Sequence, residues 1–208
     1  MILDGFSVGS IDANCFIVGC EETKEAVVID PGAEGGRILK RIASLGLKVK
    51  YIILTHGHID HIGALDEVQR GTGAKVLIHA EDAGMLTDAG KNLSTYVGPA
   101  AKMRAPDQLL KDGDIVKFGK ETMEVIHTPG HTKGGISLKC GPDVIFSGDT
   151  LFAGSVGRSD FPGGSHTQLI ESIKKKLLQF PPETNVYPGH GPATTIGMEK
   201  RYNPFLIF

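Results

Sequence analysis

The sequence predicts an α/β fold in which apolar strands form the core and amphipathic helices cover it. Short β-type runs recur along the chain, and helical patterns lie between some of them. The expected strands are 15–18, 26–29, 51–54, 75–78, 115–118, 123–126, 136–138 and 144–146. Strands that alternate with helices in this way are typical of sheets whose faces are covered by helices.

Three helices are expected from the spacing of apolar residues. In 37–45 the apolar positions form one stripe, and a second helical pattern spans 62–69. The third helix begins at Ser165, which forms a capping-box pattern with Gln168, and it ends before Pro181.

Length and composition predict one domain over residues 1–208, with no charge bias toward a particular partner. Hydrophobic residues make up 40%, charged residues 22%, and the formal net charge is -2. A nucleic-acid binder usually has a basic excess, so no nucleic-acid partner is expected, and Lys174, Lys175 and Lys176 are interpreted as a solvated helix face. No run reaches the roughly 18 apolar residues of a membrane span, so no membrane partner is expected.

The N-terminal residues and the cysteines favour a cytoplasmic location. Asp4, Asp12 and Asn14 interrupt the apolar stretch that a signal peptide would need. The three cysteines, Cys15, Cys20 and Cys140, include no C-x-x-C pair, so they are expected to be buried thiols in a reducing compartment.

Glycine and proline cluster where several apolar runs end, and most of these turns carry a residue that could bind a metal. The turns are Asp30-Pro31-Gly32, Thr128-Pro129-Gly130-His131, Ser147-Gly148-Asp149 and Tyr187-Pro188-Gly189-His190. Loops held by a rigid scaffold are common places for binding and catalytic residues.

Three of the eight histidines fall in one short window, which follows the strand expected at 51–54. His56 and His58 can converge on one ion from an extended turn, while Asp60 and His61 are offset enough to face a second ion. Nitrogen and oxygen ligands without a nearby thiolate favour a catalytic site over a closed structural zinc site. The alternative is that these histidines only cap the helix that follows.

Three further ligands complete two metal sites. His131, Asp149 and His190 each stand at a strand-end turn. Together with the window at 56–61 they predict two divalent ions per chain, zinc or alternatively iron or manganese. A bridging carboxylate would offset the repulsion between two ions, and Asp149 is assigned this role.

The run Thr55–His61, followed in order by His131, Asp149 and His190, resembles the metallo-β-lactamase superfamily. The match extends from residues 14–16 and 28–32 to the end of the chain. The resemblance implies a four-layered αβ/βα sandwich with metals at one edge, between two sheets. It further implies that one metal is held by His56, His58 and His131, that the other is held by Asp60, His61 and His190, and that Asp149 bridges them.

Within that superfamily, segments 146–152, 157–164 and 203–205 resemble the glyoxalase II-like branch, which hydrolyses glutathione thioesters such as S-lactoylglutathione. Full-length members have Glu-Tyr-Thr after the last motif histidine and a C-terminal helical domain that binds glutathione. Here segment 188–197 leads almost directly to the end of the sequence, as in the short hydroxyacylglutathione hydrolase-like form. Weak binding of the thiol portion is therefore expected.

Two charged residues outside the ligand set have open roles. Arg158 lies among glycines after the Asp149 turn and is the predicted contact for an anionic substrate, although it could instead pair with Asp160. Asp30 lies beneath the metals as an orienting residue if the resemblance holds, and ordinary turn chemistry explains it nearly as well. His79 and His127 are interpreted as structural, and His166 as a surface residue.

The predicted function is hydrolysis of a small-molecule acyl thioester by water that two metal ions activate to hydroxide at neutral pH. Asp60 and Asp149 are the catalytic-centre carboxylates, with Asp60 a ligand rather than a free base. No nucleophile elbow or phosphate-binding loop is present in the sequence.

The main alternative is a persulfide dioxygenase with a single iron held by His56, His131 and Asp149. Such enzymes typically have Pro-Ala-His-Asp-Tyr around the last motif histidine, where this sequence has Pro188-Gly189-His190-Gly191. Lactone or phosphodiester hydrolysis at the same dimetal centre is a further alternative, and a binding protein without catalysis is the last.

Overall fold

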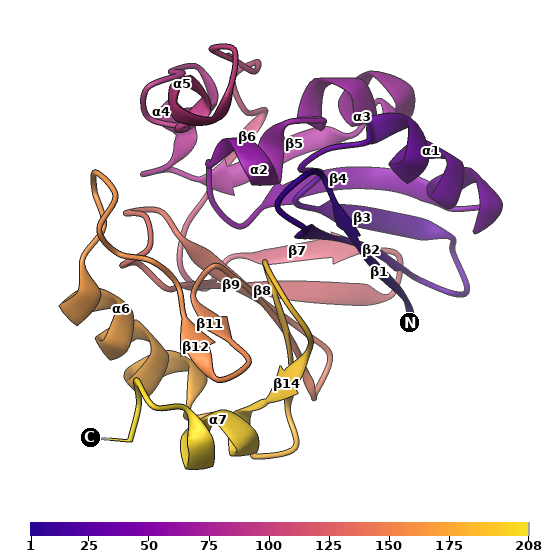
Figure 1. The fold of residues 1–208 in the computed structure, drawn as a ribbon. Coiled ribbons are helices and arrows are strands. Elements are labelled where there is room, and N and C mark those ends of the chain that lie inside the picture. Colours follow the sequence, from indigo (N-terminus) through magenta and orange to yellow (C-terminus); the bar gives the residue numbers. More distant parts are fainter. Residues whose placement is uncertain (208) are drawn as a thin grey trace.

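Two six-stranded sheets pack face to face in the computed structural model, which describes residues 1–207 (Figure 1). The first sheet has the order β1-β2-β3-β4-β5-β6, with strands Ile2–Val8, Ala13–Gly19, Glu25–Ile29, Lys48–Leu54, Lys75–His79 and Gln108–Leu110. The second has the order β14-β13-β10-β9-β8-β7, with strands Thr194–Thr195, Asn185–Pro188, Val144–Gly148, Ile136–Cys140, Glu121–His127 and Ile115–Phe118. A small hairpin joins β11 (Leu151–Phe152) to β12 (Ser155–Val156).

Helices cover the outer face of each sheet (Figure 1). On the first sheet lie α1 (Gly35–Ser44) and α3 (Leu65–Thr72), and short helices α2 (Ile59–Ile62), α4 (Ala83–Leu86) and α5 (Ser94–Val97) stand in its connections. On the second sheet lies α6 (His166–Ser172), which continues as a π-helical segment, η1 (Ile173–Leu177). The last helix, α7 (Ile196–Tyr202), follows β14.

Three apolar clusters define four layers. Successive residues of one strand enter different clusters: Ile17 of β2 packs beneath the helices of the first sheet, while Val18 packs between the sheets. In the second sheet Phe146 faces the other sheet and Ile145 faces α6. Side chains on alternate sides of a strand produce this division, because both faces of each sheet are buried. The layers confirm the predicted αβ/βα sandwich.

Parallel pairing brings the carboxyl ends of several strands to one edge of the sandwich. In the first sheet β3, β4, β5 and β6 are parallel neighbours, and in the second sheet β10 is parallel to β13. The residues after Ile29, Leu54, Gly148 and Pro188 therefore emerge close together, which is where ligands bind in open sheets of this kind.

All eight expected strands are present, and each lies within the bounds of a strand in the structure. The prediction of one helix over 62–69 is wrong, because the chain breaks between α2 and α3. At the break the amide of Ala64 donates to the carbonyl of Pro31 at 2.9 Å, so the backbone there bonds to the loop after β3.

The helix expected from Ser165 is present with the predicted start. The Ser165 hydroxyl accepts from the Gln168 amide at 3.4 Å, which is one half of a capping box. The Ser165 amide instead donates to the carbonyl of Gly130 at 2.8 Å, so the helix start is tied to the turn that carries His131.

The cysteines and the lysine cluster lie as their sequence context predicts. The three cysteines are buried free thiols, as predicted. Lys175 and Lys176 form ion pairs with Glu171 and Asp112 at 3.2 and 3.0 Å, which agrees with a solvated helix face. Within residues 1–207 no helix combines the length and the apolar character needed to cross a bilayer.

Candidate metal centre

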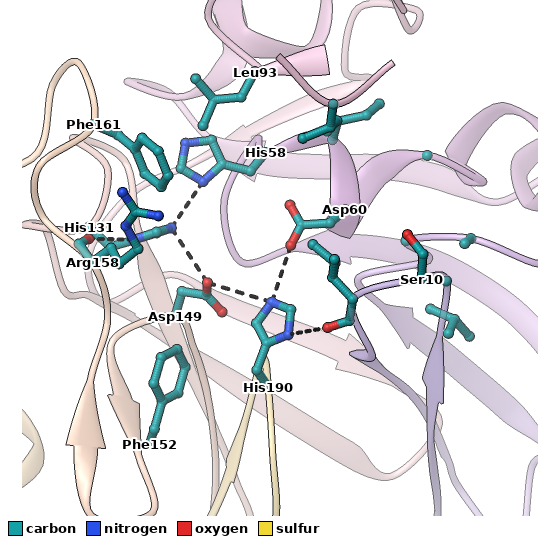
Figure 2. A pocket seen from close by; sticks show the side chains of 18 residues that line it. Ser10, His58, Asp60, Leu93, His131, Asp149, Phe152, Arg158, Phe161 and His190 are labelled. Carbon is teal, nitrogen blue, oxygen red and sulfur yellow. Dashed lines mark hydrogen bonds and ion pairs between the residues drawn. The ribbon is translucent and has the colours of Figure 1, made fainter. Parts of the chain in front are cut away.

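The seven predicted ligands converge at the edge where the parallel strands end. Figure 2 shows His58, Asp60, His131, Asp149 and His190 among them. Four come from the loop after β4 and from α2, one follows β8, one directly follows β10, and one follows β13. They are His56, His58, Asp60, His61, His131, Asp149 and His190.

The first cluster consists of three buried imidazoles. Ligand atoms of His56, His58 and His131 all lie within 4.8 Å of one another. The Nδ1 atom of His58 is 2.9 Å from the Nε2 atom of His131, so both point into the same space. Three imidazole nitrogens in such an arrangement can hold one divalent ion.

The second cluster combines a carboxylate with two imidazoles. Ligand atoms of Asp60, His61 and His190 also lie within 4.8 Å of one another. The Nε2 atom of His190 is 3.1 Å from Oδ2 of Asp60 and 3.3 Å from Nε2 of His61. This cluster is less enclosed than the first, because Asp60 and His190 are partly exposed.

The carboxylate of Asp149 lies between the two clusters. Its oxygens are 3.6 Å from Nε2 of His131 in the first cluster, and 3.4 and 3.8 Å from Nε2 of His61 and of His190 in the second. One carboxylate can therefore reach both groups, as a bridging ligand would have to.

Contacts on the outer side of the histidines hold four of the five rings with Nε2 facing inward. In each ring Nδ1 lies beside a protein oxygen, a common way to set the ring orientation of metal ligands. The pairs are His56 with the Thr55 hydroxyl at 3.2 Å, His61 with Asp30 at 3.0 Å, His131 with the Arg158 carbonyl at 2.6 Å, and His190 with the Ile11 carbonyl at 3.1 Å.

Two buried polar atoms of the centre have no hydrogen-bond partner within the described part of the chain: Nε2 of His56 and Oδ1 of Asp149. Buried polar atoms are rarely left unpaired, so a native protein has a reason for each one. Both are donor atoms of the kind that borderline divalent metals prefer. The residues present therefore fit a divalent metal pair.

Burial and neighbouring charges separate the protonation states of the histidines. Burial lowers the pKa of His56 well below its usual range and that of His58 to about 3, with the surrounding imidazoles adding to the effect. Burial would also lower the pKa of His61, but Asp149, Asp60 and Asp30 together raise it to about 10. His56 and His58 are thus neutral and ready to bind, whereas a metal in the second cluster would have to displace a proton from His61.

Asp30 supports the centre from below. Its carboxylate accepts from the Thr55 amide at 2.7 Å and from the Thr55 hydroxyl at 2.6 Å, and it contacts His61 Nδ1. Its backbone has φ of 51°, a left-handed conformation that is uncommon outside glycine. This arrangement gives Asp30 the orienting position that the resemblance implies.

Arg158 lies at the centre's edge and forms an ion pair with Asp160. Two hydrogen bonds of 3.0 and 2.8 Å join the guanidinium to the carboxylate, and the guanidinium carbon lies 4.2 Å from the centroid of the Phe161 ring. The pairing that the sequence left open is therefore present. Contact between Arg158 and an anionic substrate stays a prediction.

The other histidines lie outside the metal clusters. His79 and His127 stack on each other with centroids 4.1 Å apart, and His166 is exposed, as predicted. His58 precedes α2 but makes no side-chain cap hydrogen bond, which contradicts the alternative that it serves to cap this helix.

Sequence reasoning missed Asp82, which links the loops carrying the first cluster. This buried carboxylate accepts from the Thr132 hydroxyl and from the Gly134 amide, both at 2.7 Å, and also from the Gly57 amide. Burial raises the pKa of Asp82, and these hydrogen bonds partly offset the increase. Its only sequence signal is its place just after a strand end, so its role depends on tertiary structure.

We expect Asp82→Ala to lower the free energy of unfolding by about 2–4 kcal/mol, because it leaves buried donors unpaired in two loops. Metal content of the first cluster is expected to fall as well. Urea denaturation and elemental analysis measure both effects.

The control is Asp112→Ala, which removes an exposed carboxylate that also accepts a hydrogen bond from a backbone amide, that of His127. We expect it to lower the free energy of unfolding by less than about 1 kcal/mol. Equal effects of the two changes would contradict the role given to Asp82.

Comparisons with known proteins agree with this architecture. The model of the metallo-β-lactamase superfamily matches residues 9–190, a span that includes all seven predicted ligands. Hydroxyacylglutathione hydrolase GloC of Haemophilus influenzae is 38% identical over 209 residues, covering 99% of this chain and 98% of the relative. A protein of Mycobacterium leprae is 40% identical over 216 residues, covering 99% of each.

Solved structures resemble the chain over nearly its whole length. BLEG-1, described as a B3 metallo-β-lactamase, has a TM-score of 0.95 at 38% identity, with both chains fully covered. TTHA1623 in a di-iron-bound form has a TM-score of 0.86 at 38% identity, covering 98% of this chain and 100% of that one. ETHE1 from Myxococcus xanthus has a TM-score of 0.81 at 33% identity, covering 98% and 84%. On its sequence, fold and site, the chain belongs to the metallo-β-lactamase superfamily.

Proposed function

We propose that this protein binds two divalent metal ions and hydrolyses acyl thioesters. One ion would be held by His56, His58 and His131, the other by Asp60, His61 and His190, and Asp149 would bridge them. The observation that carries the proposal is the position of Asp149, whose carboxylate lies within reach of an imidazole from each cluster.

When bound, the ions would polarise the thioester carbonyl and lower the pKa of the attacking water. The residues of the chain hold and orient this centre. Asp60 contacts His61 and His190, so it is better suited to ligation than to service as a free base. Water adds to the carbonyl carbon and the carbon–sulfur bond breaks, which gives a carboxylic acid and a thiol. A thiolate is a good leaving group, so no separate general acid is needed.

The similarity to GloC supports a thioester as the substrate, with S-lactoylglutathione as the reference compound. Arg158 lines the pocket beside the proposed ligands, and its guanidinium already pairs with Asp160. We therefore propose that the thiol portion binds weakly, which raises KM more than it lowers kcat.

A second candidate is a dioxygenase that acts on persulfides through a single iron. It is favoured by the similarity to ETHE1, and His56, His131 and Asp149 would hold the iron. The two candidates differ in metal content and in the co-substrate consumed, so one preparation can distinguish them.

We expect purified, metal-reconstituted protein to contain close to two divalent ions per chain, because seven nitrogen and oxygen ligands exceed what one ion requires. Inductively coupled plasma analysis after removal of loosely bound metal measures the ratio. His190→Ala should reduce it toward one, since this change affects only the second cluster. A ceiling of one iron per chain, with oxygen consumed on addition of glutathione persulfide, would favour the dioxygenase.

The activity assay follows hydrolysis of S-lactoylglutathione at constant metal content, with a β-lactam as the comparison substrate because BLEG-1 is described as a lactamase. Thioester hydrolysis that disappears with a chelator and returns with metal is the expected result. A fully metallated protein without thioesterase activity would overturn the substrate assignment and leave the fold unaffected.

A further inference from the structure

A pocket of about 490 Å³ opens beside the proposed metal ligands Asp60, Asp149 and His190. The walls of this pocket are mainly apolar. Its large apolar side chains include Val8, Ile11, Leu93, Val97, Phe152 and Phe161. Figure 2 shows Phe152 below Asp149, and Phe161 and Leu93 beside His58, so apolar surface reaches the reacting centre itself.

Among the described residues outside the proposed ligands, the only charged side chain that lines this pocket is Arg158. Its guanidinium is already paired with Asp160 through two hydrogen bonds and lies against the Phe161 ring. The glutathione portion of a thioester carries two carboxylates, whereas Arg158 is one cation whose charge Asp160 already balances. A charged thiol portion would therefore gain little from this surface.

Leu93 is held in a conformation that leucine rarely adopts. Its backbone has φ of 66°, in the left-handed region, where a side chain with a Cβ is strained. Asn92, which is buried, holds the turn: its side chain accepts from the Ser94 amide at 3.0 Å and donates to the Ala101 carbonyl at 2.9 Å. The strain is thus balanced by hydrogen bonds that keep an apolar side chain beside His58 (Figure 2).

Apolar side chains also surround the entrance of the pocket. Ile11 and Val97 both line the pocket, yet they are 57% and 70% exposed. Apolar groups exposed around a concavity are typical of a binding site for an apolar ligand. The same surface thus continues from the entrance to the metal ligands.

We infer that this site selects thioesters in which a group attached to the reacting thioester bond, on the acyl side or on the thiol side, is apolar and uncharged. The inference rests on the proposed thioesterase function and names its substrate class. The apolar substituent could belong to the acyl portion or to the thiol portion, and the experiment separates the two.

In the acyl arm, the metal-reconstituted full chain is assayed on acetyl, butyryl and hexanoyl thioesters of N-acetylcysteamine, a neutral thiol. We expect kcat/KM to rise by up to about fourfold for each methylene that the pocket buries. In the thiol arm, the acyl group is held at butyryl, and N-acetylcysteamine is compared with glutathione and with an uncharged alkyl thiol. We expect the two neutral thioesters to be favoured over the glutathione thioester by tenfold or more. If kcat/KM depends mainly on acyl chain length, the acyl portion occupies the pocket. If it depends mainly on the identity of the thiol, the thiol portion does.

Leu93→Asn tests the wall directly, since asparagine tolerates the left-handed conformation but removes the apolar surface. It is expected to flatten the chain-length dependence to less than half the wild-type slope. The control is Tyr96→Asn, which introduces the same residue three positions along the chain, where the side chain is 77% exposed and outside the pocket lining. This control should keep the wild-type slope.

A binding measurement keeps this inference separate from the proposed function. Dissociation constants of S-methyl, S-butyl and S-hexyl thioethers of N-acetylcysteamine are measured by calorimetry, which requires no hydrolysis. Tighter binding with longer alkyl chains supports the apolar site even if no thioester is hydrolysed, a result that would overturn only the thioesterase proposal. Hydrolysis without any dependence on chain length or thiol charge, together with equal thioether affinities, would overturn the substrate class and leave the thioesterase proposal intact.

Discussion

Asp149→Ala is expected to lower kcat/KM for thioester hydrolysis by about a thousandfold or more, the largest loss among single ligand changes. A metal pair contributes several kcal/mol to transition-state stabilisation, and about 4 kcal/mol corresponds to a thousandfold. The Asp149 carboxylate contacts His131 of the first cluster as well as His61 and His190 of the second. Its removal therefore affects both proposed metal sites.

The matched comparison is His190→Ala, which removes one partly exposed ligand from the second cluster only. We expect a smaller loss, about tenfold to a hundredfold, with one metal retained. Steady-state kinetics and metal analysis on the same preparations give the ranking, and urea denaturation verifies that both variants fold. Equal losses with equal metal contents would contradict a bridging role, as would an Asp149→Ala protein that keeps both metals.

The ligands could be predicted from the sequence because their signals are local. His56, His58 and His61 stand within a few residues of one another, and Asp149 stands in the turn Ser147-Gly148-Asp149 that follows an apolar run. A strand-end turn and a cluster of imidazoles are visible without tertiary information. The grouping of these segments at one edge of the sandwich was implied by the resemblance, and in the structure it depends on parallel strands.

The supporting residues could not be predicted in the same way. Asp82 acts through Thr132 and Gly134, which lie about fifty residues further along the chain. Leu93 matters because of a backbone angle that no local pattern of apolar residues indicates. The role of such residues follows from packing between distant segments, so periodicity and spacing carry little information about them.

The fold predictions failed where a segment has an interrupted apolar pattern or where its backbone bonds to a distant segment of the chain. Strand β1 was missed because Asp4, Gly5 and Ser7 interrupt its apolar pattern, and as an edge strand it pairs only with β2. The break between α2 and α3 was missed because it depends on a bond from Ala64 to the loop after β3.

Gly32→Ala is expected to lower the free energy of unfolding by about 3 kcal/mol or more and to empty the second metal site. A Cβ atom at Gly32 would lie 1.7 Å from the carbonyl oxygen of Asp60 and 2.8 Å from its carbonyl carbon. Both are backbone atoms, so the loop after β3 and the first turn of α2 would have to separate. That turn carries Asp60 and His61, two of the three ligands in the second cluster.

Gly36→Ala provides the matched control, with the same substitution four residues along the chain. In α1 the added Cβ would meet only the Glu67 carboxylate, at an ordinary distance of 3.6 Å. Alanine is the better helix former by up to about 1 kcal/mol, so this variant should be as stable as the wild type or more stable. Urea denaturation and metal analysis of both variants test the contrast. A Gly32→Ala protein that keeps both metals and wild-type stability would show that the close packing of Gly32 on Asp60 does not position the second cluster. Opposite signs for the two substitutions would show that contact with the Asp60 backbone, rather than the loss of a glycine, determines the outcome.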